Sequence, residues 1–416
     1  MKSTFKKILF ALILFNTTHA HTQNLAAFQL PLKLQREKKF DIPFQFRNNF
    51  IVIPITFEDD ISLLFIFDTG AEHTTLLKKN IATNAKIKLE RPIQLLGADL
   101  KTKIDAHIAR RCRFQIGDIR FKRDILVLEK DYLEIEKNIG IPIDGILGVE
   151  LFAGFQITIN YLEQKITVAA DQAIKPPVGK KWQKIPIEII KNKPYIHLDL
   201  KNHAAQTPTN VKLLLDTGAA LALLLAVTEN STLQIPEQTI RANLGAGLGG
   251  SIAGVVGRTP VVELANYALT QVPTHFQDLR ARGDTVFFSN RDGIVGNEIL
   301  SRFIVVLDFS TGFAYFKKNR RFYTDFIYDR SGLTIVASGK NLDHYTIFDV
   351  LPNSPASEID LQPGDEILRV GMWSAKWFSL GSISDKLEGR VGEKIRLKIR
   401  RNQQILKKTI TLRNLI

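Results

Sequence analysis

The chain has 416 residues, of which 45% are hydrophobic, and a formal net charge of +14 at pH 7. This length is enough to bury the cores of two or three domains, and the single cysteine, Cys112, excludes an intramolecular disulfide. The positive charges are scattered and no arginine and aromatic platform accompanies them, so we expect no nucleic-acid partner.

Residues 1–20 have the pattern of a signal peptide. Three lysines precede an apolar stretch over residues 8–15, and Thr18-His19-Ala20 follows as a small-residue cleavage site. The apolar stretch is much shorter than the about 20 residues that cross a bilayer, and no later segment qualifies. We therefore expect export to the periplasm or cell exterior without stable membrane insertion. Residues 21–40 form an N-terminal arm, which the sequence leaves open as an inhibitory leader, a pairing strand or a disordered segment.

The central part of the chain is a duplicated pattern. The tetrapeptide Asp-Thr-Gly-Ala begins at Asp68 and again at Asp216, and each copy is followed by Asp-Gly-Ile-(Leu/Val)-Gly. The interval is 76 residues in both copies, from Asp68 to Asp144 and from Asp216 to Asp292. Matched spacing over so long an interval indicates a duplication into two similar lobes.

Each copy of the tetrapeptide ends an apolar run that is typical of a buried strand, at residues 63–67 and 211–215. Short β-branched and aromatic runs separated by Gly, Pro, Asn and Asp extend over residues 40–316, which indicates an all-β region. We place lobe 1 at residues 41–172 and lobe 2 at residues 184–322, joined by a linker at residues 173–183.

A third unit is predicted at residues 328–416. Strand-like runs at 332–336 and 345–350 lead to Ser354-Pro355-Ala356 and then to Pro-Gly-Asp-Glu-Ile. A short helix is predicted over residues 382–388, before a last pair of strands. This arrangement resembles a bacterial PDZ domain.

The paired Asp-Thr-Gly motifs, each with a downstream apolar-apolar-Gly, resemble those of the aspartic proteases. The single chain with two lobes is similar to the pepsin-like enzymes, whereas the alanines Ala71 and Ala219 are more similar to the retroviral type. The whole chain resembles a bacterial exported retropepsin-like aspartyl protease with a C-terminal PDZ domain. The resemblance implies a mainly β fold with two homologous β-barrel lobes, followed by a small PDZ-like β-sandwich with one or two short helices.

Two carboxyl groups supply what peptide hydrolysis without a metal needs, because one takes a proton from water and the other gives a proton to the carbonyl oxygen. The resemblance implies that Asp68 and Asp216 are this catalytic pair. Like charges about 4 Å apart repel by roughly 4 kcal/mol at an effective dielectric near 20, so the pair holds one proton over a broad pH range. Because Ala71 and Ala219 have no hydroxyl to donate to the carboxylates, we expect activity at less acidic pH than in relatives with Ser or Thr there.

The other motif positions have supporting roles in this interpretation. Gly70 and Gly218 let the backbone approach the carboxylates closely. Gly148 and Gly296 let a strand pass behind each loop. The resemblance implies that the two threonines hydrogen-bond across the lobes, and Asp144 and Asp292 are predicted to be structural. The supporting residues are Thr69, Gly70, Ala71, Gly148, Thr217, Gly218, Ala219 and Gly296.

In each copy, one segment occupies the place where the family has a flap that closes over the substrate. The second segment is rich in glycine and the first is not, so we expect unequal mobility. The flap candidates are Gly97 in lobe 1 and Gly245, Gly247, Gly249 and Gly250 in lobe 2.

In the PDZ-like unit, the resemblance implies a groove between the helix and the first strand, to which a peptide adds as an extra strand. The groove residues are Gly332, Leu333, Thr334 and Ile335. The loop before this strand departs from the usual glycine-and-aromatic carboxylate loop, so an internal peptide or a lobe of the same chain are alternative occupants.

The sequence therefore predicts an aspartic endopeptidase that acts on a peptide or an unfolded protein, with a PDZ module that recognises the substrate or regulates the cleft. The alternative is a catalytically inactive periplasmic peptide-binding scaffold on the same fold. The eight histidines show no metal-ligand spacing, so we expect neither a metal nor another cofactor.

Overall fold

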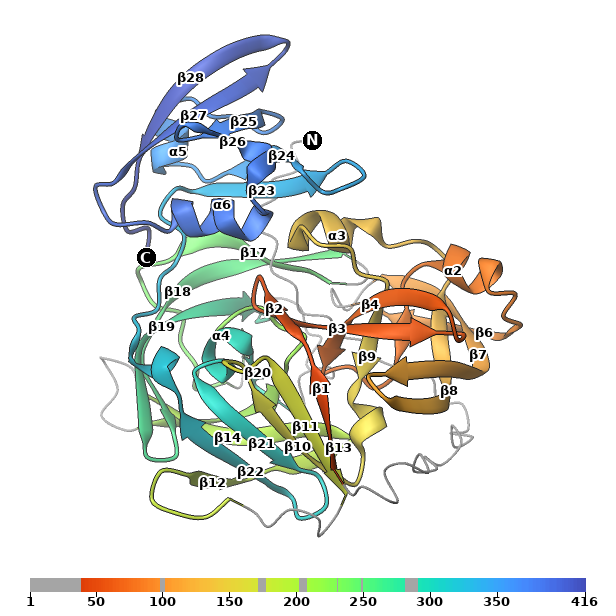
Figure 1. Ribbon diagram of the computed structural model, residues 1–416. Helices are drawn as coiled ribbons and strands as arrows, with labels where there is room; N and C mark the ends of the chain where they lie inside the picture. Colours follow the sequence, from red (N-terminus) through yellow and green to blue (C-terminus); the bar gives the residue numbers. More distant parts are fainter. Residues whose placement is uncertain are drawn as a thin grey trace.

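The computed structural model describes residues 39–97, 102–170, 177–201, 208–229, 231–247, 250–280 and 291–416. Strands account for 53% and helices for 12%, which confirms the prediction of a mainly β protein. The predicted signal peptide and the predicted arm up to residue 38 lie outside the described residues. Figure 1 shows the two lobes with the smaller C-terminal unit, drawn in blue, above them. Within the described ranges, no helix is long and apolar enough to cross a membrane.

A six-stranded sheet joins the two lobes (Figure 1). Its strands lie in the order β1 (Lys39–Pro43), β11 (Lys165–Ala170), β10 (Phe155–Asn160), β21 (Phe303–Asp308), β22 (Phe313–Lys318) and β12 (Gln183–Pro186). The central pair, β10 and β21, is antiparallel and connects lobe 1 to lobe 2. One apolar core continues through both lobes. The last two residues of the predicted arm, Lys39 and Phe40, belong to β1 and pair with β11.

Lobe 1 is a closed six-stranded barrel. Around the barrel its strands are β3 (Phe50–Phe57), β4 (Ile61–Asp68), β9 (Gly145–Gly148), β5 (Thr75–Leu76), β8 (Ile119–Leu128) and β7 (Lys103–Ile116). β7 pairs back with β3 and closes the barrel. The flanking elements are β2 (Gln45–Arg47), α2 (Lys79–Asn84), β6 (Leu89–Leu96), α3 (Leu133–Ile139) and the 3-10 turn η1 (Val149–Phe152).

Lobe 2 repeats this topology. Around its barrel the strands are β14 (Lys193–Lys201), β15 (Thr209–Leu215), β20 (Gly293–Val295), β16 (Leu223–Val227), β19 (Tyr267–Asp278) and β18 (Gly250–Leu264), with β18 pairing back to β14. The flanking elements are β13 (Glu188–Ile190), β17 (Ile240–Gly247) and α4 (Asn297–Leu300). The parallel pairing of β15 with β20 matches that of β4 with β9. The duplicated sequence therefore forms two barrels of one topology, as predicted.

The C-terminal unit follows the 3-10 turn η3 (Arg320–Tyr323) and has its own apolar core. Its sheet has the order β23 (Leu333–Ser338), β24 (His344–Val350), β25 (Glu366–Val370), β27 (Lys394–Arg401) and β28 (Gln404–Thr411), and β26 (Trp373–Ser374) pairs with β25. The helical elements are α5 (Pro355–Glu358), η4 (Ala375–Trp377) and α6 (Leu380–Leu387). α6 begins two residues before the predicted helix, because the Ser379 hydroxyl accepts a hydrogen bond from the Ser382 amide and caps the first turn.

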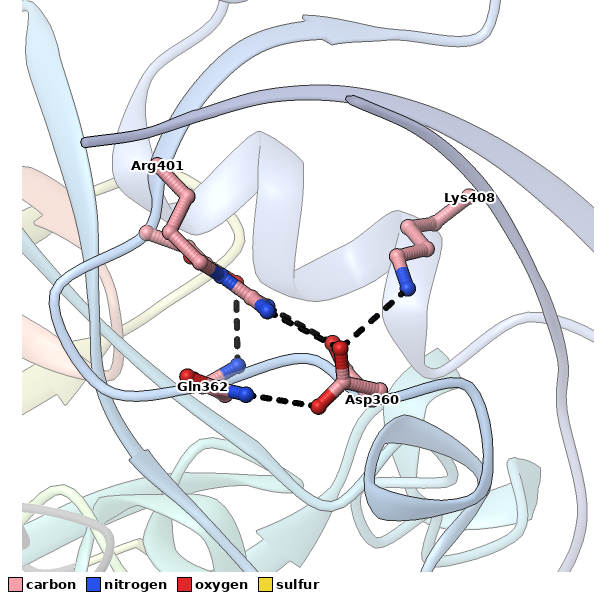
Figure 2. Close-up of polar contacts among 5 residues, drawn as sticks. Asp360, Gln362, Arg401 and Lys408 are labelled. Carbon is pink, nitrogen blue, oxygen red and sulfur yellow. Dashed lines mark hydrogen bonds and ion pairs between the residues drawn. The ribbon is translucent and has the colours of Figure 1, made fainter. Parts of the chain in front are cut away.

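A polar network fixes the loop between α5 and β25 to the last two strands (Figure 2). Arg401 donates to the Asp360 carboxylate at 2.9 Å and to the Asp365 carboxylate at 2.6 Å. Lys408 lies 3.6 Å from Asp360, and the Gln362 side chain donates to Asp360 at 2.6 Å. The hydrogen bond from Gln362, followed by the interactions with Arg401 and Lys408, lowers the pKa of Asp360 to about 2.

The C-terminal unit contacts both lobes. On lobe 1, Leu380 packs against Gly140, and Gly381 packs against the side chain of Asn48. On lobe 2, Arg258 donates to the carbonyl of Ile416 at 3.4 Å. The unit therefore bridges the two barrels on the side where Figure 1 places α3 and β17.

Candidate active site

The two Asp-Thr-Gly loops meet at the boundary between the lobes. Asp68 is the last residue of β4, and Asp216 follows β15, so each aspartate lies where a buried strand ends. Both side chains are fully buried. A Cβ atom added to Gly70 would lie 2.7 Å from Oδ2 of Asp216, and one added to Gly218 would overlap the Asp68 carboxyl group. Each carboxyl group therefore packs against the glycine of the opposite loop.

Backbone amides orient the two carboxyl groups. Oδ1 of Asp68 accepts hydrogen bonds from the amides of Gly70 at 2.7 Å and Ala71 at 3.1 Å, and Oδ1 of Asp216 accepts one from the amide of Gly218 at 2.8 Å. Among the described residues, no N–H group donates to either Oδ2 atom. The two carboxyl groups are close enough to interact electrostatically.

Two threonines join the loops across the lobes. The hydroxyl of Thr69 accepts from the amide of Thr217 at 3.0 Å, and the hydroxyl of Thr217 accepts from the amide of Thr69 at 3.0 Å. Each hydroxyl also donates to a carbonyl of the other lobe, that of Leu215 at 2.5 Å and that of Phe67 at 2.9 Å. These four buried hydrogen bonds fix the position of one aspartate relative to the other.

The later motif residues lie directly behind the loops. A Cβ atom on Gly148 would lie 2.8 Å from the backbone of His73, and one on Gly296 would lie 2.6 Å from the carbonyl oxygen of Ala219. Asp144 accepts a hydrogen bond from the amide of Leu64 at 2.9 Å, and Asp292 accepts one from the amide of Lys212 at 2.8 Å. These aspartates tie β9 and β20 to the neighbouring strands, away from the pair at the loops.

Burial raises the pKa of Asp68 well above its usual range, and the nearby Asp216 carboxyl group raises it further. Burial also raises the pKa of Asp216, but three influences oppose this rise: the hydrogen bond from Asp68, the amide of Gly218 and two cations, Arg291 and Lys193. The pair therefore retains a proton at pH values where isolated carboxyl groups are ionised, and this titration belongs to the pair as a unit.

Further cross-lobe contacts surround the loops, and the sequence analysis did not identify them. The Asn297 side chain donates to the carbonyls of Asn49 at 2.8 Å and Thr217 at 2.6 Å, and it accepts from the Tyr161 hydroxyl at 2.7 Å. Lys193 of lobe 2 donates to Glu72 of lobe 1 at 3.1 Å. Comparison of the two repeats in the sequence could have pointed to Asn297, because this polar residue occupies the position of Val149 in the first repeat.

The flap candidates lie on equivalent hairpins. Gly97 follows β6, and its amide donates to the carbonyl of Thr102, the residue before β7, at 2.8 Å. In lobe 2, Gly245 and Gly247 belong to β17, and Gly247 pairs with Gly250 at the start of β18. Gly249 lies outside the described residues.

The predicted groove residues belong to the first strand of the C-terminal unit and the turn before it. Gly332 has a φ of +79°, and its amide donates to Asp329 at 2.8 Å. Leu333 and Thr334 are buried, whereas Ile335 is half-buried. β23 is an edge strand, and both α6 and α3 of lobe 1 pack beside it.

Residues 53–151 match a protein family described as aspartyl protease. The matched segment runs from β3 through most of η1 and includes Asp68, Thr69, Gly70 and Gly148. No curated protein matches the chain. The two closed six-stranded barrels are consistent with a bilobed aspartic-protease fold, and with the family match they support a protease, which is a hydrolase.

Proposed function

We propose that this chain is an aspartic endopeptidase in which Asp68 and Asp216 activate one water molecule. The observation that carries the proposal is the meeting of two fully buried carboxyl groups from different lobes, held in register by the reciprocal hydrogen bonds of Thr69 and Thr217. A folded protein rarely buries two neighbouring carboxyl groups without a functional reason, because both lose hydration and repel each other when ionised.

The chemistry requires the pair in its singly protonated state. The carboxylate takes a proton from water as the water oxygen attacks the peptide carbonyl carbon, and the carboxylic acid gives its proton to the carbonyl oxygen. This first step gives a neutral gem-diol intermediate. The newly protonated carboxyl group then gives its proton to the amide nitrogen, the other takes a proton from one diol hydroxyl, and the C–N bond breaks. One water is consumed and the pair regains its starting state.

The first test replaces each aspartate separately. Asp68→Asn and Asp216→Asn keep the size of the side chain but prevent the paired proton transfers, so we expect cleavage of dye-labelled unfolded casein to fall by about a hundredfold or more. Asp59→Asn, at an exposed turn of lobe 1, is the control. Full activity of both variants would contradict the proposal, and absence of cleavage by the wild type at every pH tested would favour the peptide-binding scaffold.

We also propose that residues 328–416 act as a PDZ-like peptide-binding module. Support comes from the edge position of β23 and from α6, which packs beside it, because PDZ domains bind a peptide as an added strand at such an edge. The test is the anisotropy of fluorescent casein peptides with the full chain carrying Asp68→Asn. We expect Ile335→Glu on β23 to weaken binding about tenfold or more and Ile405→Glu on the opposite edge strand to leave it unchanged. Equal effects would overturn this assignment.

Export through residues 1–20 is a further part of the proposal and rests on the sequence alone. N-terminal sequencing of the protein after expression in a Gram-negative host is expected to begin at His21. An uncleaved chain in the cytosol would contradict export.

A further inference from the structure

One face of the C-terminal sheet gathers positive charge. Successive residues of β27 point to opposite sides of the sheet, and the apolar ones belong to the core of the unit, so the cations between them point outward. Directly opposite residues of an antiparallel pair share a face, so the pairing of Lys398 with Arg369 of β25 and with Lys407 of β28 adds one cation from each neighbouring strand. This basic face consists of Arg369, Lys394, Arg396, Lys398, Arg400 and Lys407.

The charge of the basic face is largely uncompensated. Glu366 lies opposite Arg400 and forms an ion pair with it at 2.9 Å. Among the residues that the structure describes, the other five cations of the face form no ion pair. Lys398 is half-buried and the rest are exposed. Soluble proteins usually mix both signs of charge on their surfaces, so a sheet face of one sign indicates a strongly negative partner.

An exposed apolar rim adjoins the basic face. It consists of Met372, Trp373 and Trp377, which are 78%, 54% and 71% exposed, and the two tryptophan rings contact each other with their centroids 5.5 Å apart. The rim begins directly after Gly371, whose amide donates to the carbonyl of Arg396 on β27 at 2.8 Å. Two of the three tryptophans of the chain therefore lie in water beside a positive surface. Tryptophan is enriched at the headgroup level of bilayers, where its ring is buried and its N–H group stays hydrated.

We propose that the C-terminal unit binds the surface of an anionic lipid bilayer, with the basic face against the headgroup phosphates and the apolar rim at headgroup depth. Each Lys or Arg near such a surface strengthens binding about fivefold. A protein partner would present both signs of charge, and a soluble polyanion would leave the rim in water. Figure 1 places β27 and β28 on the side of the unit away from the two lobes. The binding is peripheral and separate from the proposed peptide cleavage.

The test measures co-sedimentation of the full chain with phosphatidylglycerol vesicles, and with phosphatidylcholine vesicles as the neutral control. We expect binding to the anionic vesicles only, and we expect it to weaken with added salt. Lys394→Gln combined with Arg396→Gln should weaken this binding about tenfold or more. Lys88→Gln combined with Lys180→Gln removes the same charge from exposed positions outside the C-terminal unit and should change it by less than about twofold. Equal weakening by the two pairs would overturn the proposal.

Tryptophan emission separates a bilayer from a soluble polyanion. Entry of the rim into the headgroup layer lowers the polarity around Trp373 and Trp377, so their emission should shift to shorter wavelength on phosphatidylglycerol vesicles. Trp373→Phe combined with Trp377→Phe is expected to abolish the shift, whereas Trp182→Phe, outside the C-terminal unit, should keep it. Unchanged emission on vesicles that bind the chain would overturn the lipid assignment. Release of the chain from the vesicles by single-stranded DNA at equal phosphate concentration would also overturn it.

Discussion

The two lobes share their loop geometry and differ in how they contact each other around it. After the first Asp-Thr-Gly-Ala, Glu72 forms an ion pair with Lys193 of lobe 2 at 3.1 Å. At the matched place after the second, the carbonyl of Ala220 accepts a hydrogen bond from the side chain of Asn49 of lobe 1 at 3.1 Å. The backbone positions of the duplicated site are kept because both aspartates need them, whereas the side chains around them are free to diverge and make the two carboxyl groups unequal.

The largest expected effect tests the shared geometry. Gly218→Ala places a methyl group into the Asp68 carboxyl group, and Gly70→Ala places one 2.7 Å from the Asp216 carboxyl group. We expect either change to lower kcat/KM by about a hundredfold, because small displacements of reacting groups have such costs. Gly117→Ala, at a glycine with open space around it, is expected to lose about 1 kcal/mol of stability from its positive φ and to keep full activity. Normal activity of both loop variants would contradict the assigned geometry.

Replacing each threonine tests how much each lobe contributes to the hydrogen bonds between the two loops. Thr69→Val leaves the Thr217 amide and the Leu215 carbonyl without their partner, and Thr217→Val does the same to the Thr69 amide and the Phe67 carbonyl. Each change is expected to lower the free energy of unfolding by about 3 kcal/mol, measured by urea denaturation. Because the four hydrogen bonds form one network, the double variant should lose less than the sum of the single losses. A strictly additive double variant would show that the hydroxyls act independently.

Asn297 tests a difference between the lobes. Asn297→Val installs the lobe 1 residue of position 149 and removes the hydrogen bonds to the carbonyls of Asn49 and Thr217. We expect a loss of about 2 kcal/mol in the free energy of unfolding. Tyr161→Phe removes only the hydroxyl that donates to Asn297 and is expected to cost about 1 kcal/mol. If Tyr161→Phe were the more damaging change, the contact of Asn297 with Asn49 and Thr217 would not be the main one.

The smallest expected effect is on the pH dependence of stability. Burial raises the pKa of Asp68 in the folded state, so the stability contributed by its protonated form is complete below the unfolded pKa of about 3.9 and is lost as pH rises through the folded pKa. Asp68→Asn removes this loss. In a series of thermal scans above about pH 3.9, the melting temperature of Asp68→Asn minus that of wild type should therefore increase with pH. A constant difference across the series would contradict the raised pKa.

Much of the architecture followed from the repeat. Apolar runs ending at Asp68 and Asp216 predicted two buried strands that present their last residue at one place, and β4 and β15 do so. The equal intervals to Asp144 and Asp292 predicted equivalent strands beside them, which are β9 and β20. Local errors remained, as in the start of α6 at Leu380, because a capping hydrogen bond depends on one side-chain geometry and not on the apolar pattern.

The sequence by itself determined the two barrels and the place of the paired aspartates, since period, spacing and strand ends are properties of the chain order. Only the tertiary structure decided which residues of one lobe contact the other, such as Asn49 with Asn297 and Lys193 with Glu72. The reason is that such contacts join residues up to 248 positions apart, and they depend on how two closed barrels pack against each other, which no local pattern encodes.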